Sequence, residues 1–299
     1  MFGVYKRYPF HVPFRTKILN VFRFVFTFSA AEKFLIARLS PGHSRLWRKF
    51  IPPIYFYEKG SIRFAERSGI HYVLDVSTLH GYSIYFYIIK DKAWDNLFKL
   101  IQPDFNIIDA GANIGFLSLY FAKECTNGFV YSFEPDSESF DFLQKSVNQN
   151  GFKNIKLFKT ALGAEASTAE LFKVYANNPG ANRILAQKPD KETKSEIVEV
   201  ATLDSFYQKQ IFKKIDLIKI DVEGFELFVL RGAKQLVDKW KPILFIELAD
   251  INLKQQNCTA VEVIDLVEEL GYNILDAKTM LPIERKVMEY YTDIICFSK

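Results

Sequence analysis

The stretch that most constrains the fold begins at residue 105. Residues 105–108 form a short apolar run with Asp109 at its carboxyl end, which predicts a buried parallel strand. Residues 111–115 are small and glycine-rich, and an apolar run starts at Phe116. This order predicts a strand, a tight glycine turn and a helix, in which the glycines let a ligand approach backbone N–H groups at the helix N-terminus.

A second strand is expected at residues 129–133, and it ends on Glu134. An acid at this place is positioned to accept hydrogen bonds from ribose hydroxyls, so the unit is the first half of a nucleotide-binding Rossmann fold. A dinucleotide fingerprint would need glycine where Asn113 and Phe116 stand, and the chain contains no P-loop sequence. The alternative is a turn that only packs its helix on the sheet.

The remaining sequence alternates between strand and helix patterns. Expected strands lie at residues 155–159, 216–221, 243–246, 272–275 and 291–297, and expected helices at 94–101, 140–150, 204–207, 227–237 and 261–270. Two further strands, 171–175 and 197–201, would pair around a polar loop. This pattern predicts an α/β, Rossmann-like fold with a mostly parallel seven-stranded sheet and helices on both faces.

Two domains are expected. Residues 1–60 form a basic, aromatic, helical extension, with a helix over 18–39, and residues 61–299 form the catalytic domain. That domain would begin with a hairpin at 61–92, built from strands 70–76 and 82–89 around Gly81, and continue with a core at 93–299.

The extension is strongly basic. The whole chain has a net charge of +4, whereas residues 1–70 hold 13 Lys/Arg and 3 Asp/Glu. Residues 1–40 are therefore candidates for peripheral membrane contact. Alternatively, their aromatic side chains pack on the enzyme body or on a second subunit in a homo-oligomer. Nucleic acid is a weaker option, because the charge is not condensed into a run. Three scattered cysteines and the lack of a secretory signal favour the cytoplasm, with possible membrane association.

A second informative stretch, residues 215–226, reads Ile-Asp-Leu-Ile-Lys-Ile-Asp-Val-Glu-Gly-Phe-Glu. Together with Asp-Ala-Gly-Ala-Asn-Ile-Gly at 109–115, Phe-Glu-Pro at 133–135, Ala-Leu-Gly at 161–163, Asn-Pro-Gly-Ala-Asn at 178–182 and Thr-Leu-Asp at 202–204, it resembles the FkbM family of methyltransferases. The resemblance covers residues 70–297 and implies a class I methyltransferase fold with S-adenosylmethionine as cofactor. The family's known members methylate hydroxyls of sugars and polyketides.

The resemblance implies a cofactor site and a catalytic site. The implied cofactor residues are Asp109, Gly111, Ala112, Asn113, Gly115, Glu134, Pro135, Thr160, Ala161 and Asp221. The implied catalytic residues are Asp221, Glu223 and Lys219. Asp221 ends the fourth parallel strand, where open α/β sheets bind ligands.

The carboxylates at 221–226 have several possible roles. One could act as general base, two could hold a divalent cation, or they could stabilise the cationic cofactor. Alternatively, they cap the following helix, above all Glu226. Lys219 is either functional or paired with Asp216 or another carboxylate. Asp221 and Glu247 are a conceivable metal pair, although nothing further in the sequence supports a divalent metal.

The leading expectation is therefore an S-adenosylmethionine-dependent O-methyltransferase acting on a small-molecule or glycan acceptor. The alternatives are an inactive cofactor-binding module and an RNA-directed methyltransferase that uses the basic extension. The absence of an Asn/Asp-Pro-Pro-Tyr/Phe motif argues against methylation of a base amine.

Overall fold

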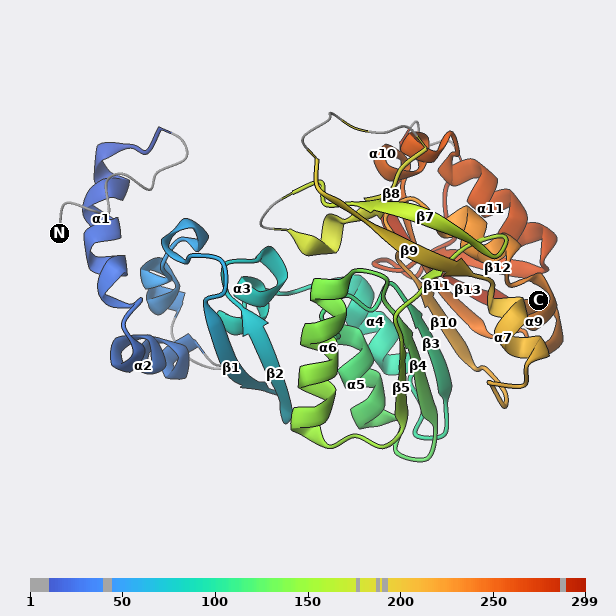
Figure 1. The fold of residues 1–299 in the computed structure, drawn as a ribbon, viewed down its shortest axis with the longest axis horizontal. Coiled ribbons are helices and arrows are strands. Elements are labelled where there is room, and N and C mark those ends of the chain that lie inside the picture. Colours follow the sequence, from blue (N-terminus) through green and yellow to red (C-terminus); the bar gives the residue numbers. More distant parts are fainter. Residues whose placement is uncertain (1–10, 40–44, 176–177, 187–188, 190–192, 286–288) are drawn as a thin grey trace. The chain divides into compact units, whose positions relative to one another are not determined.

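The computed structural model describes residues 11–39, 45–175, 178–186, 189, 193–285 and 289–299. The chain divides into two compact units, Met1–Lys90 and Asp91–Lys299 (Figure 1). The predicted boundary between an extension and a catalytic domain at residue 61 stays a prediction, because compactness alone does not define where the catalytic domain begins.

Seven strands of the described chain form one sheet in the second unit. From one edge to the other the order is β12 (Tyr272–Asp276), β13 (Tyr291–Ser298), β11 (Ile243–Ala249), β10 (Leu217–Ile220), β3 (Asn106–Ala110), β4 (Phe129–Phe133) and β5 (Ile155–Phe158). Neighbouring strands are parallel except around β13, which is antiparallel to both β11 and β12. The predicted fold class, with a mostly parallel seven-stranded sheet, is confirmed.

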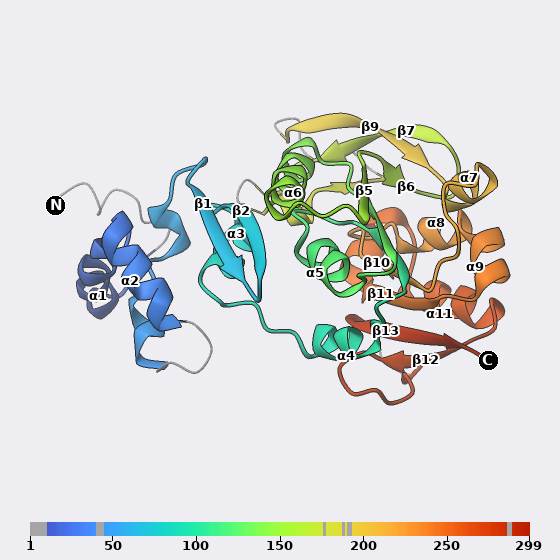
Figure 2. The same cartoon turned by 90° about the horizontal axis from the view of Figure 1, so that it is seen from below.

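Helices cover both faces of this sheet (Figure 2). On one face, α4 (Lys92–Leu100) and α5 (Phe116–Glu124) pack with Ile107 and Phe245. On the other face, α7 (Leu203–Gln208), α8 (Glu226–Arg231), α9 (Lys234–Trp240) and α11 (Ala260–Glu269) pack with Ile108 and Ile246. Adjacent residues of one strand therefore face opposite cores, which is why the central strands carry apolar residues at successive positions. The remaining helices of this unit are α6 (Ser137–Asn150) and the short α10 (Asp250–Leu253).

The helix predicted at 227–237 is wrong in one respect, because α8 and α9 are separate. They meet at Gly232, where a Cβ atom would lie 2.0 Å from the carbonyl oxygen of Gly163. The close backbone approach occurs where the two helices separate.

A smaller sheet of four strands accompanies the main one in the described chain. Its order is β6 (Ala161–Leu162), β9 (Ser195–Ala201), β7 (Ser167–Phe172) and β8 (Arg183–Ile184). The strand pair predicted around a polar loop is present as antiparallel β7 and β9, with Leu171 opposite Glu196. The predicted bounds of the first strand, 171–175, are wrong, because β7 begins at Ser167 and ends at Phe172. Several residues of that loop lie outside the described part.

The first unit contains helices and a hairpin. Its elements are α1 (Phe14–Val25), α2 (Ser29–Leu39), the 3-10 helices η2 (Arg45–Phe50) and η3 (Ile54–Phe56), β1 (Ile62–Arg67), β2 (Ile70–Asp75) and α3 (Leu79–Tyr85). No helix in the described ranges combines the length and apolarity that a membrane crossing requires.

The hairpin prediction is partly wrong. The two strands are β1 and β2, joined through Ser68 and Gly69, which both have positive φ. The predicted strand at 82–89 does not form, because Thr78 caps helix α3 by accepting a hydrogen bond from the Gly81 N–H. A Cβ atom on Gly81 would lie 2.1 Å from the Asp75 carbonyl oxygen, so this glycine serves a tight helix start and not a hairpin turn.

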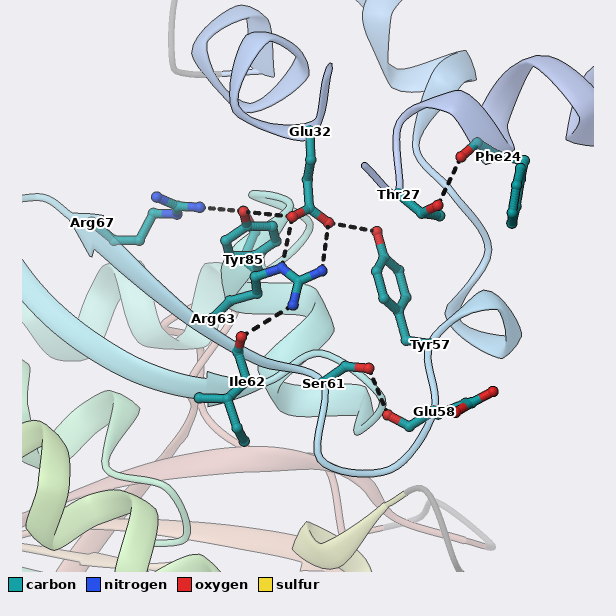
Figure 3. Close-up of polar contacts among 10 residues, drawn as sticks. All are labelled: Phe24, Thr27, Glu32, Tyr57, Glu58, Ser61, Ile62, Arg63, Arg67 and Tyr85. Carbon is teal, nitrogen blue, oxygen red and sulfur yellow. Dashed lines mark hydrogen bonds and ion pairs between the residues drawn. The ribbon is translucent and has the colours of Figure 1, made fainter. Parts of the chain in front are cut away.

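The single helix predicted at 18–39 is also wrong, because α1 and α2 are separated at residues 26–28. The Thr27 hydroxyl donates to the Phe24 carbonyl oxygen at 2.7 Å (Figure 3). Hydroxyl side chains compete for backbone acceptors in this way and favour helix ends.

Candidate active site

The candidate site lies where the carboxyl ends of β3, β4, β10 and β11 meet. Strand β3 has β10 on one side and β4 on the other, so the strand order reverses there. Ligands of open α/β sheets bind at such a switch point. The predicted site residues at the ends of these strands are therefore brought to one edge of the sheet.

The glycine turn is hydrogen-bonded by the protein itself. The N–H groups of Gly111 and Ala112 both donate to the Phe133 carbonyl oxygen, and the Gly115 N–H donates to the Ala112 carbonyl oxygen. The Asn113 N–H donates to Glu134, at 2.7 Å, and the Ile114 N–H donates to the Asn113 side chain, at 2.8 Å. The N–H groups of residues 111–115 are thus bonded within the chain, and the approach of a ligand to the N–H groups at the start of α5 stays a prediction.

Gly111 is required because the glycine turn after β3 closely approaches the end of β10 at Asp221. It has a φ of +81°, and a Cβ atom there would lie 1.8 Å from the Asp221 carbonyl oxygen. Only glycine accommodates both conditions. The turn after β3 and the end of β10 are therefore in direct backbone contact.

Glu134 is buried just beyond β4, as the sequence predicts. Its two oxygens accept hydrogen bonds from the Asn113 and Asp136 N–H groups, at 2.7 and 2.8 Å. Burial raises the pKa of this carboxyl to about 8, although these hydrogen bonds act in the opposite direction. A carboxylate has about four acceptor positions, so two remain for a ligand.

Lys219 is the centre of the site. Its Nζ lies 3.1 Å from Asp109 Oδ1 and 3.6 Å from Asp221 Oδ2. It also donates to the carbonyl oxygens of Ala110 and Gly111, at 3.1 and 2.7 Å. Burial alone lowers the pKa of Lys219, but the two carboxylates outweigh it and raise the pKa above its ordinary value. Lys219 is therefore a fixed cation that joins both motifs.

The pairing of Lys219 with Asp216 that the sequence left open is not the one observed. Asp216 lies beside Lys214, at 2.7 Å, and accepts from the Asn106 N–H, at 2.9 Å. Asp109 is held further by the Ser118 hydroxyl, at 2.5 Å.

Glu223 belongs to a network that sequence reasoning missed. Its Oε2 accepts from the Asn252 side chain, at 2.9 Å, and lies 3.3 Å from Nη2 of Arg183. Arg183 is buried and also donates to Asn252 and to the Ala181 carbonyl oxygen. The one signal in the sequence was the Asn-Pro-Gly-Ala-Asn motif that directly precedes Arg183.

Two features make Glu223 unusual. It is a non-glycine residue with a φ of +57°, a backbone conformation that costs energy and is frequent at functional sites. Burial and the neighbouring Asp221 raise the pKa of Glu223 to about 7, with Arg183 acting in the opposite direction. A carboxyl with a pKa near neutrality suits a general base.

Glu226 has the capping role that the sequence allowed. Its Oε1 accepts from the N–H groups of Val222 and Gly224, both at 3.0 Å. It therefore holds the turn between β10 and α8, and burial raises its pKa to about 7.

Glu247 and Asp293 face each other across β11 and β13. The Oε2 atom of Glu247 is buried and has no hydrogen-bond partner in the described chain. Burial and then the nearby Asp221 raise the pKa of Glu247 well above its ordinary value, and the pKa of Asp293 is raised to about 7 for the same reasons. Among the described residues, no three His, Cys, Asp or Glu side chains are grouped to hold a metal ion.

The small sheet is tied to this edge of the main sheet. Lys173 lies 3.3 Å from Asp136, and Asn182 donates to Asp136 at 3.0 Å. Pro135 stands between Glu134 and Asp136, while Thr160 and Ala161 follow the carboxyl end of β5. The predicted cofactor residues Pro135, Thr160 and Ala161 thus lie at the strand ends next to Glu134.

Comparison with known proteins identifies a family and several relatives. Residues 109–274 match the sequence profile described as "Methyltransferase FkbM domain". "Methyltransferase sdnD" of Sordaria araneosa is 28% identical over 204 residues, covering 56% of this chain and 78% of that protein. "Methyltransferase 1" of Beauveria bassiana is 30% identical over 183 residues, covering 54% and 71%.

Two solved structures are reported as similar to this chain. Methyltransferase FkbM from Methylobacillus flagellatus has a TM-score of 0.46 and 15% identity; the match covers 93% of this chain and 58% of that one. SMU.1697c, a putative methyltransferase from Streptococcus mutans in complex with SAH, has a TM-score of 0.43 and 11% identity, covering 71% and 99%.

Proposed function

This chain belongs to the FkbM family of methyltransferases, and from that premise we propose that it methylates a hydroxyl oxygen of a sugar, glycan or related metabolite. Family membership confirms the predictions of a methyltransferase and of S-adenosylmethionine as its cofactor. The acceptor class and the roles of individual residues are part of the proposal.

The observation that carries the proposal is that Lys219 contacts both the glycine turn after β3 and Asp221 at the end of β10. Its ammonium group joins Asp109 and the Gly111 carbonyl oxygen, on the cofactor side, to Asp221, on the other side. A methyl donor in the turn and a carboxylate at the end of β10 would therefore share one site, which is the proximity that a direct transfer needs.

The cofactor side uses the residues around the turn. Glu134 binds the ribose hydroxyls with its unused acceptor positions. Gly111, Ala112, Asn113 and Gly115 surround the methionine part, and Pro135, Thr160 and Ala161 border the adenine. Asp109 acts through Lys219, because the Asp109 carboxylate is fully buried and pairs with the Lys219 ammonium group.

The acceptor side uses Asp221 and Glu223. Glu223 is the general base, since its pKa of about 7 lets it accept a proton near neutral pH. The bound cofactor supplies an electrophilic methyl carbon. Glu223 would take the proton that the acceptor hydroxyl releases when its oxygen receives the methyl group. Asp221, whose side chain is 38% exposed, stabilises the positive charge of the cofactor.

The test combines cofactor binding with turnover. Calorimetry with S-adenosylhomocysteine should show binding that Glu134→Ala weakens at least about tenfold, whereas Glu165→Ala, which removes an exposed carboxylate of the same unit, should leave it unchanged. Radiolabelled S-adenosylmethionine is then offered with sugars, glycosides and oligosaccharides. Transfer to a hydroxyl, reduced by Glu223→Gln with binding retained, is the expected result.

The alternatives give different results. Cofactor binding without transfer to any acceptor would favour the inactive binding module, and unchanged binding in Glu134→Ala would reject the cofactor assignment. Loss of transfer on adding a chelator would favour the Asp221 and Glu247 metal pair, which our proposal does not require.

A further inference from the structure

Helix α1 of the first unit carries a row of exposed apolar side chains. Phe14, Ile18, Phe22 and Val25 are 76%, 47%, 58% and 52% exposed. Their spacing of three and four residues places them on one helix face. Contiguous apolar surface of this kind marks an interaction site, whereas single exposed apolar residues do not.

The opposite face of α1 is polar and is the face packed inside the unit. Asn20 is fully buried and donates to the Tyr55 hydroxyl at 2.9 Å. Arg23 donates to the Asn20 side chain and to the Lys49 carbonyl oxygen, at 3.0 and 2.7 Å. These contacts fix the rotation of α1, so its apolar row remains outward.

The aromatic residues of the extension divide between two roles. Phe24 and Phe26 pack internally against Phe56 and Phe50, with ring centroids 6.0 and 5.8 Å apart. The aromatic packing inside the unit therefore uses residues other than those of the outward row on α1.

The charged side chains of α1, α2 and η2 are positive with one exception. Arg15 and Lys17 lie on α1, and Lys33, Arg38, Arg48 and Lys49 are exposed on α2 and η2. Residues 11–57 contain one acid, Glu32.

Glu32 does not offset this positive charge at the surface (Figure 3). It is buried on α2, where it accepts from Arg63, Tyr57 and Tyr85, at 2.6, 2.9 and 3.3 Å. The carboxylate of Glu32 is therefore buried inside the unit, and the residues that flank the apolar row on α1, Arg15 and Lys17, are basic.

We propose that the α1 face, formed by Phe14, Ile18, Phe22 and Val25 with Arg15 and Lys17, binds the surface of an anionic phospholipid bilayer. An apolar helix face bordered by Lys and Arg is the pattern of helices that lie in the bilayer interface, where the apolar side chains enter the acyl boundary and the bases meet the headgroups. A second copy of this chain fits less well, because a symmetric pairing of the same face would place its basic borders near each other.

Vesicle co-flotation of the full chain tests this proposal. We expect binding to phosphatidylcholine vesicles that contain phosphatidylglycerol, weaker binding to pure phosphatidylcholine, and a decrease with added salt. The double variant Phe14→Ser/Phe22→Ser should bind at least about tenfold more weakly. Phe64→Ser is the matched control, because Phe64 is 71% exposed on β1, outside the α1 face. Circular dichroism and thermal unfolding verify that each variant is folded.

Three results would overturn the proposal: no binding to the anionic vesicles at low salt, equal loss of binding in Phe64→Ser and the double variant, or binding independent of lipid charge. Light scattering adds a further one. A dimer that the double variant converts to monomer, without vesicle binding by the wild type, would assign the face to a second copy.

Discussion

The Nζ atom of Lys219 lies 3.1 Å from the Oδ1 atom of Asp109, and both side chains are buried. The two residues are register partners on the adjacent parallel strands β10 and β3. The charge in each strand is therefore neutralised by its neighbour. Either charge alone would be buried without a partner, which strongly destabilises an apolar sheet.

Lys219→Met should lower the free energy of unfolding by about 3–5 kcal/mol, because it leaves Asp109 buried without its partner. The double variant Asp109→Asn/Lys219→Met should recover part of this loss, since both charges are then removed. Urea denaturation of the two single variants and the double variant forms a double-mutant cycle. Strictly additive losses would contradict a direct coupling of the two charges.

Gly111→Ala should lower the free energy of unfolding by about 2–4 kcal/mol, because the new methyl group meets the Asp221 carbonyl oxygen in addition to the strain of a positive φ. Gly151→Ala isolates the strain alone: Gly151 has a φ of +66° and nothing within 4 Å of a Cβ position. That control should lose about 1–2 kcal/mol. Equal losses in urea denaturation would mean that the close approach relaxes without cost.

Glu226→Gln should make stability less dependent on pH. The pKa of Glu226 is about 7 in the folded chain, above its ordinary value of 4.5, so its contribution to stability is fully present below about 4.5 and is lost as pH rises to 7. Glutamine keeps the oxygen that accepts both backbone N–H groups but does not ionise. At pH 8 the variant should be more stable than wild type, by about 1–3 kcal/mol.

Urea denaturation at pH 5 and pH 8 measures this difference. Glu269→Gln, an exposed site on α11, is the control and should follow the wild type at both values. A Glu226→Gln variant less stable than wild type at pH 8 would show that the ionised carboxylate is favourable there.

Arg183→Gln should raise the pKa of Glu223 above about 7, because it removes the cation that lies 3.3 Å away. Arg183→Lys should give a smaller shift, since it keeps the charge but loses the planar fork of donors. The titration is followed by carboxyl carbon NMR of glutamate-labelled protein, with Glu223→Gln to assign the signal. Arg231→Lys, at an exposed site, should leave the pKa of Glu223 unchanged. An unaltered Glu223 pKa in Arg183→Gln would contradict the electrostatic effect of Arg183 on Glu223.

The sequence was most informative where local pattern and chain order coincide. Strand β4 and the position of Glu134 follow from a short apolar run that ends on an acid, and α6 ends at Gly151 as expected. Strands β12 and β13 likewise follow from the patterns at residues 272–275 and 291–297. These features depend on neighbours in the sequence, which a single chain displays directly.

Polar contacts between residues far apart in the chain could not be predicted from the sequence in this way. Arg183 reaches Glu223 and Asn252 from a different sheet, and no periodic pattern encodes that meeting. Gly81 misled the hairpin prediction for a related reason. A glycine forced by a close approach to Asp75 looks the same in sequence as a glycine in a turn.

The self-bonded glycine turn bears on how fast the cofactor binds. Five successive N–H groups, from Gly111 to Gly115, have partners before any nucleotide arrives. The entropy of ordering this loop is therefore lost during folding and not again on binding. Association of S-adenosylhomocysteine should behave as a single-step encounter, with an observed rate that rises linearly with ligand concentration and does not saturate at a rate of loop closure.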